Sequence, residues 1–352
     1  MRRLGRMGLG ALAGVVALVA AGCGGGSADD GGGAVVLLTH DSFAISKDVK
    51  AAFEQESGYT LRLLQQGDAG EVVNRALLTA GDPQGDVLFG TDDSLLSRAL
   101  DGDLFEPYAS SEQGSIDPAF AIEDDRVTPI DHGEVCLNAD RAFYAKEGRR
   151  PPQGLDDLAD PRYRGQLVVQ NPATSSPGLA FLLATVARYG EDGWQDYWRR
   201  LRANDVLVTD GWQDAYTQQF SGAAGSPGTR PLVVSYATSP AAEVIFAGKP
   251  LEESPTLAIE DGCFRQVEYA GILRGARTED GARALVDFLL SERFQADVPG
   301  TMFVYPVRAG TPIPPAFEQH AIRPERPLSL PPSTIAERRD RWIEEWTRIV
   351  LR

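Results

Sequence analysis

The sequence of 352 residues lacks the short motifs that mark common catalytic and nucleotide-binding sites. It has no Gly-x-x-x-x-Gly-Lys-Ser/Thr loop for phosphates and no Gly-x-Gly-x-x-Gly turn for dinucleotides. It also has no His-Glu-x-x-His pair for zinc and no Gly-x-Ser-x-Gly turn for a serine nucleophile. Since no nucleophile stands beside an evident base, the sequence predicts a protein that is not an enzyme and uses no cofactor.

Cysteine and histidine are scarce, because the chain has only 3 residues of each type. The histidines lie far apart in sequence and no Cys-x-x-Cys occurs, so the spacing of a zinc site is absent and no metal is expected. Cys23 belongs to the N-terminal segment described below, which leaves Cys136 and Cys263. Outside the cytoplasm two such thiols usually form a disulfide, and two buried free thiols are the alternative.

Basic residues are also fewer than acidic residues. The 34 Lys and Arg residues face 50 Asp and Glu residues, which gives a formal net charge of -16 at pH 7. Because a phosphate backbone requires a basic surface, this balance argues against a nucleic-acid partner. It is compatible with a cationic ligand, although net charge chiefly governs solubility.

The N-terminal segment has the features of an export signal. Arg2, Arg3 and Arg6 precede an almost uncharged run over 7–21, which ends in small residues before Cys23. The run is shorter than the roughly 20 residues that a membrane-spanning helix needs. Residues 24–33 contain only Gly, Ser, Ala and Asp, a composition typical of a flexible linker.

The residues before this linker, Ala20-Ala21-Gly22-Cys23, resemble the lipobox of bacterial lipoproteins, although Ala20 stands where that family usually has Leu. In the family the cysteine is lipidated after cleavage and becomes the mature N-terminus. The resemblance implies a signal peptide over 1–22, a linker over 23–33, and acyl chains on Cys23 that hold the protein at the outer face of the cytoplasmic membrane. An ordinary cleaved signal and an uncleaved membrane anchor are the alternatives.

Short apolar runs then alternate with amphipathic segments. The first series predicts strands and helices over 35–38, 47–56, 61–64, 71–79 and 87–89. The second series predicts them over 167–169, 178–189, 207–209, 212–220 and 232–235, with a strand over 264–270 and a helix over 282–290 near the end. Such alternation predicts an α/β fold with parallel, helix-covered sheets.

The length favours two lobes, since one domain usually holds about 100 to 150 residues. We expect lobe 1 over 34–131 and 264–312, and lobe 2 over 132–263. The chain would then cross between the lobes near 131–138 and near 262–268. Cys136 and Cys263 fall on these two crossings, so a disulfide between them would stiffen a hinge.

Residues 313–352 form a C-terminal extension that opens with several prolines. Thr334 and Glu337 have the spacing of a capping box, which predicts that a helix begins there and continues through Trp342 and Trp346. Because these tryptophans share one face of an amphipathic helix, we expect them in the core rather than at a ligand.

Polar residues gather after the predicted strands, which is where ligands bind in open parallel sheets. These loops bring carboxylates and aromatic rings together, a combination that suits an aromatic cation. The candidates are Asp41, Asp68, Asp92, Trp212, Tyr236 and Phe303. Each has an alternative role, because an Asp after a strand often caps a helix and buried Trp or Tyr often only packs.

A second candidate feature is the loop over 171–178, where Ser175 or Ser176 can cap a helix whose first residue is Pro177. Helix N-termini bind anions, so this loop and the backbone amides around Ala69 and Gly70 are candidates to receive a phosphate or hydroxyl group. Simple helix capping is the alternative for either serine.

At this point the sequence resembles the substrate-binding proteins of thiamine ABC transporters, a branch of the bilobed periplasmic binding proteins. Six blocks in order carry the resemblance, which covers almost all of the chain after the linker: THDSF at 39–43, VNR at 73–75, NPATSSPGL at 171–179, GWQDAY at 211–216, SYATSP at 235–240 and YPV at 305–307. It implies a type II fold with Venus-flytrap closure. It also implies a monomer that binds thiamine or a thiamine phosphate between its lobes and delivers it to a permease driven by an ATPase.

By this resemblance, the contacts to thiamine or its phosphates come from positions at or near Asp68, Trp212, Tyr236 and one serine of the pair. Three positions depart from the family pattern, because His40 and Ala242 stand where the family often has Tyr and Phe303 stands for a Trp. The alternatives are therefore a receptor of the same fold for a polyamine, a sugar phosphate or ferric ion, and an exported enzyme. The predicted ligand-binding residues are His40, Asp41, Asp68, Ala69, Asp92, Ser175, Ser176, Trp212, Tyr236 and Phe303.

Overall fold

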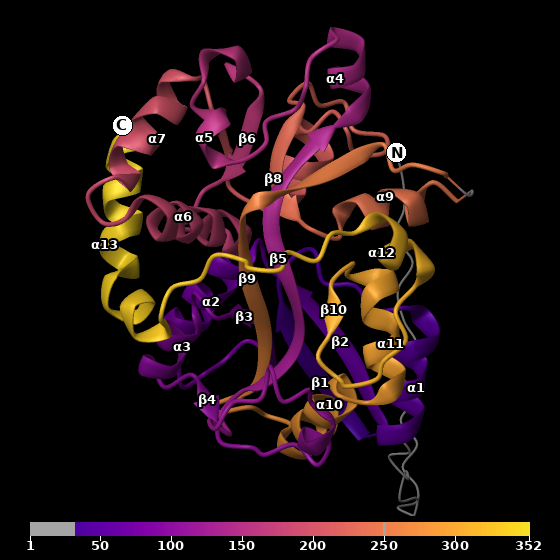
Figure 1. Cartoon of the computed structure of the whole chain (residues 1–352). Helices are drawn as coiled ribbons and strands as arrows, with labels where there is room; N and C mark the ends of the chain where they lie inside the picture. Colours follow the sequence, from indigo (N-terminus) through magenta and orange to yellow (C-terminus); the bar gives the residue numbers. More distant parts are fainter. Residues whose placement is uncertain (1–31, 249–250) are drawn as a thin grey trace, which may run out of the picture. The chain divides into compact units, whose positions relative to one another are not determined.

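The computed structural model describes residues 32–248 and 251–352 (Figure 1). The predicted signal, the lipobox with Cys23 and nearly all of the linker lie outside the described residues. Across these two ranges, no helix combines the length and the apolar character that crossing a bilayer requires.

The strands of the described residues form one mixed sheet in the order β2-β1-β3-β9-β5-β8-β6-β7, with β4 beside β9 and β10 beside β5. Their bounds are β1 (Gly32–Thr39), β2 (Tyr59–Gln65), β3 (Val87–Asp92), β4 (Phe105–Glu106), β5 (Thr128–Asp140), β6 (Leu167–Gln170), β7 (Leu207–Thr209), β8 (Leu232–Tyr236), β9 (Thr256–Leu273) and β10 (Tyr305–Pro306).

Helices lie between most of these strands. They are α1 (Lys47–Ser57), α2 (Ala69–Leu78), α3 (Leu96–Asp101), α4 (Arg141–Glu147), α5 (Leu155–Leu158), α6 (Ser176–Tyr189), α7 (Trp194–Ala203), α8 (Trp212–Asp214), α9 (Ser239–Phe246), α10 (Glu279–Leu289), α11 (Glu292–Thr301), α12 (Pro315–His320) and α13 (Pro332–Val350). The helix predicted over 212–220 is α8 followed by a π-helical turn over Ala215–Gln219.

The prediction of parallel sheets holds within each lobe but fails where the lobes join. β1 runs parallel to β2 and β3, and β6 runs parallel to β7 and β8. β5 and β9, however, pair antiparallel with each other and with β8 and β3 respectively. The difference arises because β5 leads the chain from the first lobe to the second and β9 leads it back.

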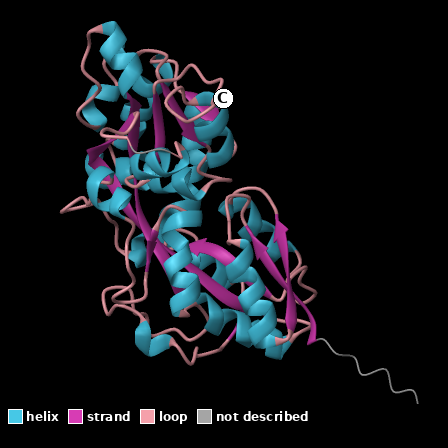
Figure 2. Cartoon of the chain, turned by 90° about the vertical axis from the view of Figure 1, so that its right-hand side faces the viewer, coloured by secondary structure: helices cyan, strands magenta, loops and turns pink. Residues whose placement is uncertain are grey.

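β5 and β9 are long strands that pass through both groups of strands, which Figure 2 shows as an upper and a lower cluster with helices packed on each. Their ladder has an irregularity between Val135 and Leu137. At that break, Cys136 and Cys263 form a disulfide across 127 residues of sequence. The two strands that connect the lobes are thus covalently tied at their midpoint.

Two large apolar cores pack against the sheet, one within the first lobe and one that extends from α2 of the first lobe to α6 and α7 of the second. In the first lobe Phe53 of α1 meets Phe288 of α10, with ring centroids 5.3 Å apart. In the second lobe Trp198 of α7 packs in the same cluster as α6 and meets Trp346 of α13 edge to face at 5.4 Å.

The C-terminal helix α13 confirms one prediction and corrects another. Trp342 and Trp346 are completely buried, as expected for core residues. The capping box at Thr334 and Glu337 is wrong, because α13 begins at Pro332 and no side chain caps it. Proline at the first helical position has its φ angle fixed for a helix and lacks the N–H that a cap would satisfy, so the helix starts earlier than the motif suggested.

Candidate functional site

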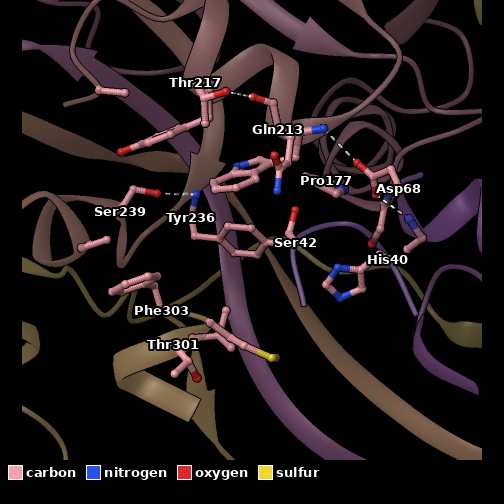
Figure 3. Close-up of a pocket in the computed structure, with 18 of the residues that line it drawn as sticks. His40, Ser42, Asp68, Pro177, Gln213, Thr217, Tyr236, Ser239, Thr301 and Phe303 are labelled. Atoms are coloured by element: carbon pink, nitrogen blue, oxygen red, sulfur yellow. Dashed lines mark hydrogen bonds between the residues drawn. The ribbon is translucent and has the colours of Figure 1, made fainter. Parts of the chain in front are cut away.

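A cavity of about 440 Å³ lies where loops and helix N-termini of the two lobes meet (Figure 3). Its volume is within the range of small-molecule sites, about 300 to 1,000 Å³. In Figure 3, His40 and Asp68 lie on one side of the cavity, Phe303 and Thr301 lie on the opposite side, and Tyr236 lies between them. The wall thus has a polar side and an apolar side.

His40 and Glu268 form part of the polar side. His40 directly follows β1, whereas Glu268 lies inside β9. The His40 Nε2 atom is 3.6 Å from Glu268 Oε1 and has no hydrogen-bond partner among the described residues. Gly90 makes room for the imidazole, because a Cβ at this position would lie 2.5 Å from the ring. The site therefore depends on a glycine in β3 to seat a histidine after β1.

Glu268 faces a second carboxyl, since it is the cross-strand partner of Asp131 on β5. Burial raises the pKa of Glu268 well above its ordinary value, and the Asp131 carboxyl raises it further while His40 lowers it. Burial likewise raises the pKa of Asp131 to about 7, and neither oxygen of Asp131 has a hydrogen-bond partner in the described residues. Two opposed buried carboxyls hold a proton more readily than one, so an arriving cation, which favours the ionised form, would displace a proton from this pair.

Asp68 is held differently, because its carboxylate is the N-cap of α2. Asp68 Oδ1 accepts from the backbone N–H of Ala69 at 2.6 Å and of Ser176 at 3.3 Å, and Oδ2 accepts from Trp212 N–H at 2.9 Å. The last two donors belong to the second lobe. Asp68 therefore links the lobes through the helix N-termini that border the cavity.

Two aromatic rings follow the strands of the second lobe. Trp212 stacks on Tyr216 with centroids 5.0 Å apart and lies edge to face with Tyr236 at 6.3 Å. The indole Nε1 of Trp212 donates to Ser235 Oγ at 2.9 Å, which fixes the ring plane. Burial keeps the pKa of Tyr236 well above its ordinary value, so the phenol stays neutral. Neutral rings with electron-rich faces attract a flat cation.

The apolar side is formed by α9 and by the segment after α11. Phe246 and Phe303 lie with centroids 4.6 Å apart, and Phe246 is 62% exposed at the rim. Ala242 of α9 also lines the cavity. Among the described residues that line the cavity, none is Lys or Arg, whereas Asp68, Glu243 and Glu268 are acidic. The arrangement suits a planar, positively charged organic ligand.

This two-lobed fold with an interlobe cavity agrees with a family match, since the model of the "Bacterial extracellular solute-binding protein" family matches residues 82–329. The chain belongs to this family. The family is defined by solute binding rather than by an enzymatic activity.

Individual relatives of this solute-binding protein match it over a longer part of the chain. It is 31% identical over 318 residues to the thiamine-binding periplasmic protein of Salmonella typhimurium, covering 89% of this chain and 92% of the relative. It is 30% identical over 318 residues to the Escherichia coli protein of the same name, with the same coverage. The solved structure of a periplasmic thiamin binding protein superposes with a TM-score of 0.80 at 29% identity, covering 91% of this chain and 96% of that one.

Most of the residues predicted from the solute-binding protein's sequence meet at this cavity. They come from loops separated by up to 263 positions and are His40, Asp68, Ala69, Ser176, Trp212, Tyr236 and Phe303. The strand-end rule explains this result for all of them except Phe303, which follows α11, because the loops after β1, β2, β6, β7 and β8 converge at the interface of the lobes. Ala242, noted as a replaced position, lines the cavity too.

Three predicted residues do not line the cavity. Asp92 is fully buried behind it, where it accepts from Ser94 and Gln266 side chains and from Ser176 Oγ. Ser175 accepts from Gly178 N–H as the N-cap of α6, so the capping alternative describes it. Asp41 accepts from the neighbouring Ser42 hydroxyl at 3.1 Å, and Ser42 rather than Asp41 borders the cavity. These groups position their neighbours.

Sequence reasoning missed Glu268, Asp131, Tyr216 and Glu243. Glu268 and Asp131 lie inside long strands, whereas the strand-end rule considers only the loops that follow strands. Tyr216 lies four positions after Trp212 and Glu243 lies seven positions after Tyr236, and the Tyr216 hydroxyl donates to Glu243 Oε1 at 2.8 Å. A carboxyl inside a predicted strand was the one available signal, because a buried carboxyl is costly unless a partner or function compensates it.

Proposed function

We propose that this chain binds thiamine in the interlobe cavity as the solute-binding component of an ABC importer. The observation that carries the proposal is the joint presence of Trp212, Tyr236 and Glu268 on one cavity wall, in a chain about one third identical to thiamine-binding relatives. The rings would stack beside the heterocycles, and Glu268 would face the positive charge or the aminopyrimidine edge.

The remaining parts of the proposal concern delivery. The protein acts as a monomer, anchored through a lipidated Cys23 outside the cytoplasmic membrane, and passes its ligand to a permease with its ATPase. β5 and β9, tied by the Cys136 disulfide, serve as the hinge between a first lobe over 34–131 and 264–312 and a second lobe over 132–263. Ligand contacts to both lobes at once favour the closed state.

Calorimetric titration of the mature protein with thiamine tests the proposal. We expect saturable binding with a stoichiometry near one, abolished when Trp212 and Glu268 are both replaced. No heat of binding from a folded, monodisperse sample would contradict the proposal. Metabolic labelling with a fatty acid, compared between the native chain and Cys23→Ser, tests the anchor separately.

Two controls separate the alternatives. Titration with ferric ion should give no visible charge-transfer band, because that band needs tyrosinate ligands and burial holds the pKa values of Tyr216 and Tyr236 well above the ordinary value. Incubation with thiamine esters should leave them intact. Turnover that depends on a cavity residue would instead favour the exported enzyme.

A further inference from the structure

The C-terminal helix α13 contacts both lobes, although among the described residues that line the cavity none belongs to it. We propose that α13 is a brace between the lobes, whose bonds to the first lobe break when the cavity opens. The inference extends the hinge of the proposed function, because it adds a third connection to β5 and β9. It does not depend on which ligand the cavity holds.

The contact of α13 with the second lobe buries two large rings. Trp342 and Trp346 are fully buried, and Trp346 meets Trp198 of α7 edge to face at 5.4 Å. Glu191, which precedes α7, accepts from Trp342 Nε1 at 3.3 Å and from the Arg341 guanidinium at 2.6 Å. Because buried aromatic rings are costly to expose, α13 stays with the second lobe when the lobes rotate.

The contact of α13 with the first lobe includes a buried arginine. Arg339 is only 4% exposed, and its Nη1 donates to the carbonyl oxygen of Ser94, which lies between β3 and α3, at 3.2 Å. The next residue, Asp340, accepts from Arg339 Nε at 3.0 Å and lies 3.5 Å from the guanidinium of Arg98 in α3. Two successive residues of α13 are therefore bonded to the first lobe.

The turn that Arg339 contacts is also linked to the cavity. The N–H of Ser94 donates to Asp92 Oδ1 at 2.9 Å, and the other oxygen of Asp92 accepts from Ser176 Oγ. Ser176 belongs to the second lobe and lines the cavity. One turn of the first lobe thus connects α13 to a hydrogen bond that crosses between the lobes beside the cavity.

The position of α13 makes it sensitive to rotation of the lobes. In Figure 1 it lies on the other side of β5 and β9 from α9 and α11, which border the cavity. Rotation about these strands changes the spacing of the lobes on both sides, so α13 cannot keep its contacts with both. A buried guanidinium that loses its acceptor is costly, so the Arg339 bond favours the arrangement in which Asp68 bonds to Trp212 across the lobes.

The segment that leads into α13 is attached to the hinge. Ile322 N–H donates to the carbonyl oxygen of Ala237 at 3.2 Å, and Leu328 N–H donates to that of Cys263 at 2.7 Å. Ile322 also packs against the cluster that contains Cys136 and Cys263. The chain before α13 is therefore fixed at the midpoint of the hinge, which keeps the helix beside both lobes.

The test measures hydrogen exchange of three backbone amides that donate across the lobes, in the mature protein without ligand. The N–H groups of Trp212 and Ser176 donate to Asp68, and Glu71 N–H donates to the carbonyl oxygen of Thr174. All three amides lose their acceptors together when the lobes separate. A joint increase in their exchange rates therefore reports opening of the cavity.

Two variants weaken the bonds to the first lobe. Arg339→Met keeps an unbranched side chain and removes the bond to Ser94. Asp340→Lys places a cation opposite Arg98, and because the Asp340 side chain is 68% exposed this variant should fold even where Arg339→Met does not. Thermal unfolding shows whether each protein folds.

Two matched controls make the same chemical changes at positions of α13 that do not bond to the first lobe. Arg341→Met removes a bond to Glu191 of the second lobe. Glu344→Lys removes an ion pair with Arg348 of the same helix. Both controls change the charge of α13 and leave the bonds of Arg339 in place.

The exchange of the three amides should be about tenfold faster in Arg339→Met and about threefold faster in Asp340→Lys, as expected for loss of a buried charged hydrogen bond and of an exposed ion pair. The two controls should change it by less than about twofold. Thiamine affinity should fall in the same order, because fewer molecules are in the arrangement that binds.

Native exchange rates in Asp340→Lys and in folded Arg339→Met would overturn the inference, and so would an equal increase in the controls. Failure of the native protein to bind thiamine would contradict the proposed function instead. The exchange rates would still decide whether α13 is a brace, because they are measured without ligand.

Discussion

Two carboxyl groups on the same cavity wall, Asp68 and Glu268, are held in opposite ways. Asp68 accepts three backbone hydrogen bonds and links the lobes. Glu268 faces another carboxyl, Asp131, across the β5–β9 ladder and lies 3.6 Å from a histidine. The charge of Asp68 is therefore compensated by the protein itself. Glu268 is the group that gains most from an arriving cation, which makes it the counter-ion in our proposal.

The largest effect on binding is expected from Glu268→Gln, which keeps the size of the side chain and prevents it from ionising when the cation binds. Thiamine affinity should fall by about 10-fold to 100-fold, the value of a charge-assisted hydrogen bond. Calorimetry measures the change, with Glu243→Gln as the matched control because it removes a cavity carboxyl bonded to Tyr216. Equal losses in the two variants would show that general charge, rather than Glu268, attracts the ligand.

A smaller loss is expected from Trp212→Ala, which tests the aromatic part of the wall. Stacking against a cation contributes about 1 to 2 kcal/mol, so affinity should fall by about 5-fold to 30-fold. Intrinsic fluorescence quenching by thiamine should disappear in the same variant if Trp212 is the reporting ring. Unchanged affinity in a folded protein would assign Trp212 to packing against Tyr216 alone.

The carboxyl pair also predicts how stability depends on pH. The pKa of Asp131 is raised to about 7 in the folded protein from an ordinary value of 3.8, so the folded state binds more protons between these values. Stability should therefore fall as the pH rises from about 4 to about 7. Urea unfolding of Asp131→Asn should show a weaker decline, whereas replacement of the exposed Asp101 by Asn should leave the decline unchanged.

The smallest effect on thiamine affinity is expected from Phe246, at the rim of the apolar side of the cavity. Phe246 lines the cavity but remains 62% exposed, so Phe246→Ala should lower thiamine affinity by less than about threefold. A loss as large as that of Trp212→Ala would move the ligand toward the pair of Phe246 and Phe303, and would weaken the contrast between the two sides of the wall.

The sequence predicted the elements with local periodicity more fully than the contacts between distant segments. Helix α1 was expected over 47–56 and spans Lys47–Ser57, because Val49, Ala52 and Phe53 share its buried face. The strand-end rule also located His40, Asp68 and Tyr236. It did not identify Asp131 and Glu268, because their pairing depends on the register between two strands and the two residues are 137 positions apart. Strand register over such distances leaves no local pattern.

The measurement that tests the central claim most directly is a crystal structure of the protein grown with thiamine. The account predicts the flat cation inside the interlobe cavity, beside Trp212 and Tyr236, with a ring nitrogen or amino group within hydrogen-bond distance of Glu268 and with Asp68 still bonded to Ala69 and Trp212. An unoccupied cavity, or thiamine bound with Glu268 facing away from it, would contradict the account.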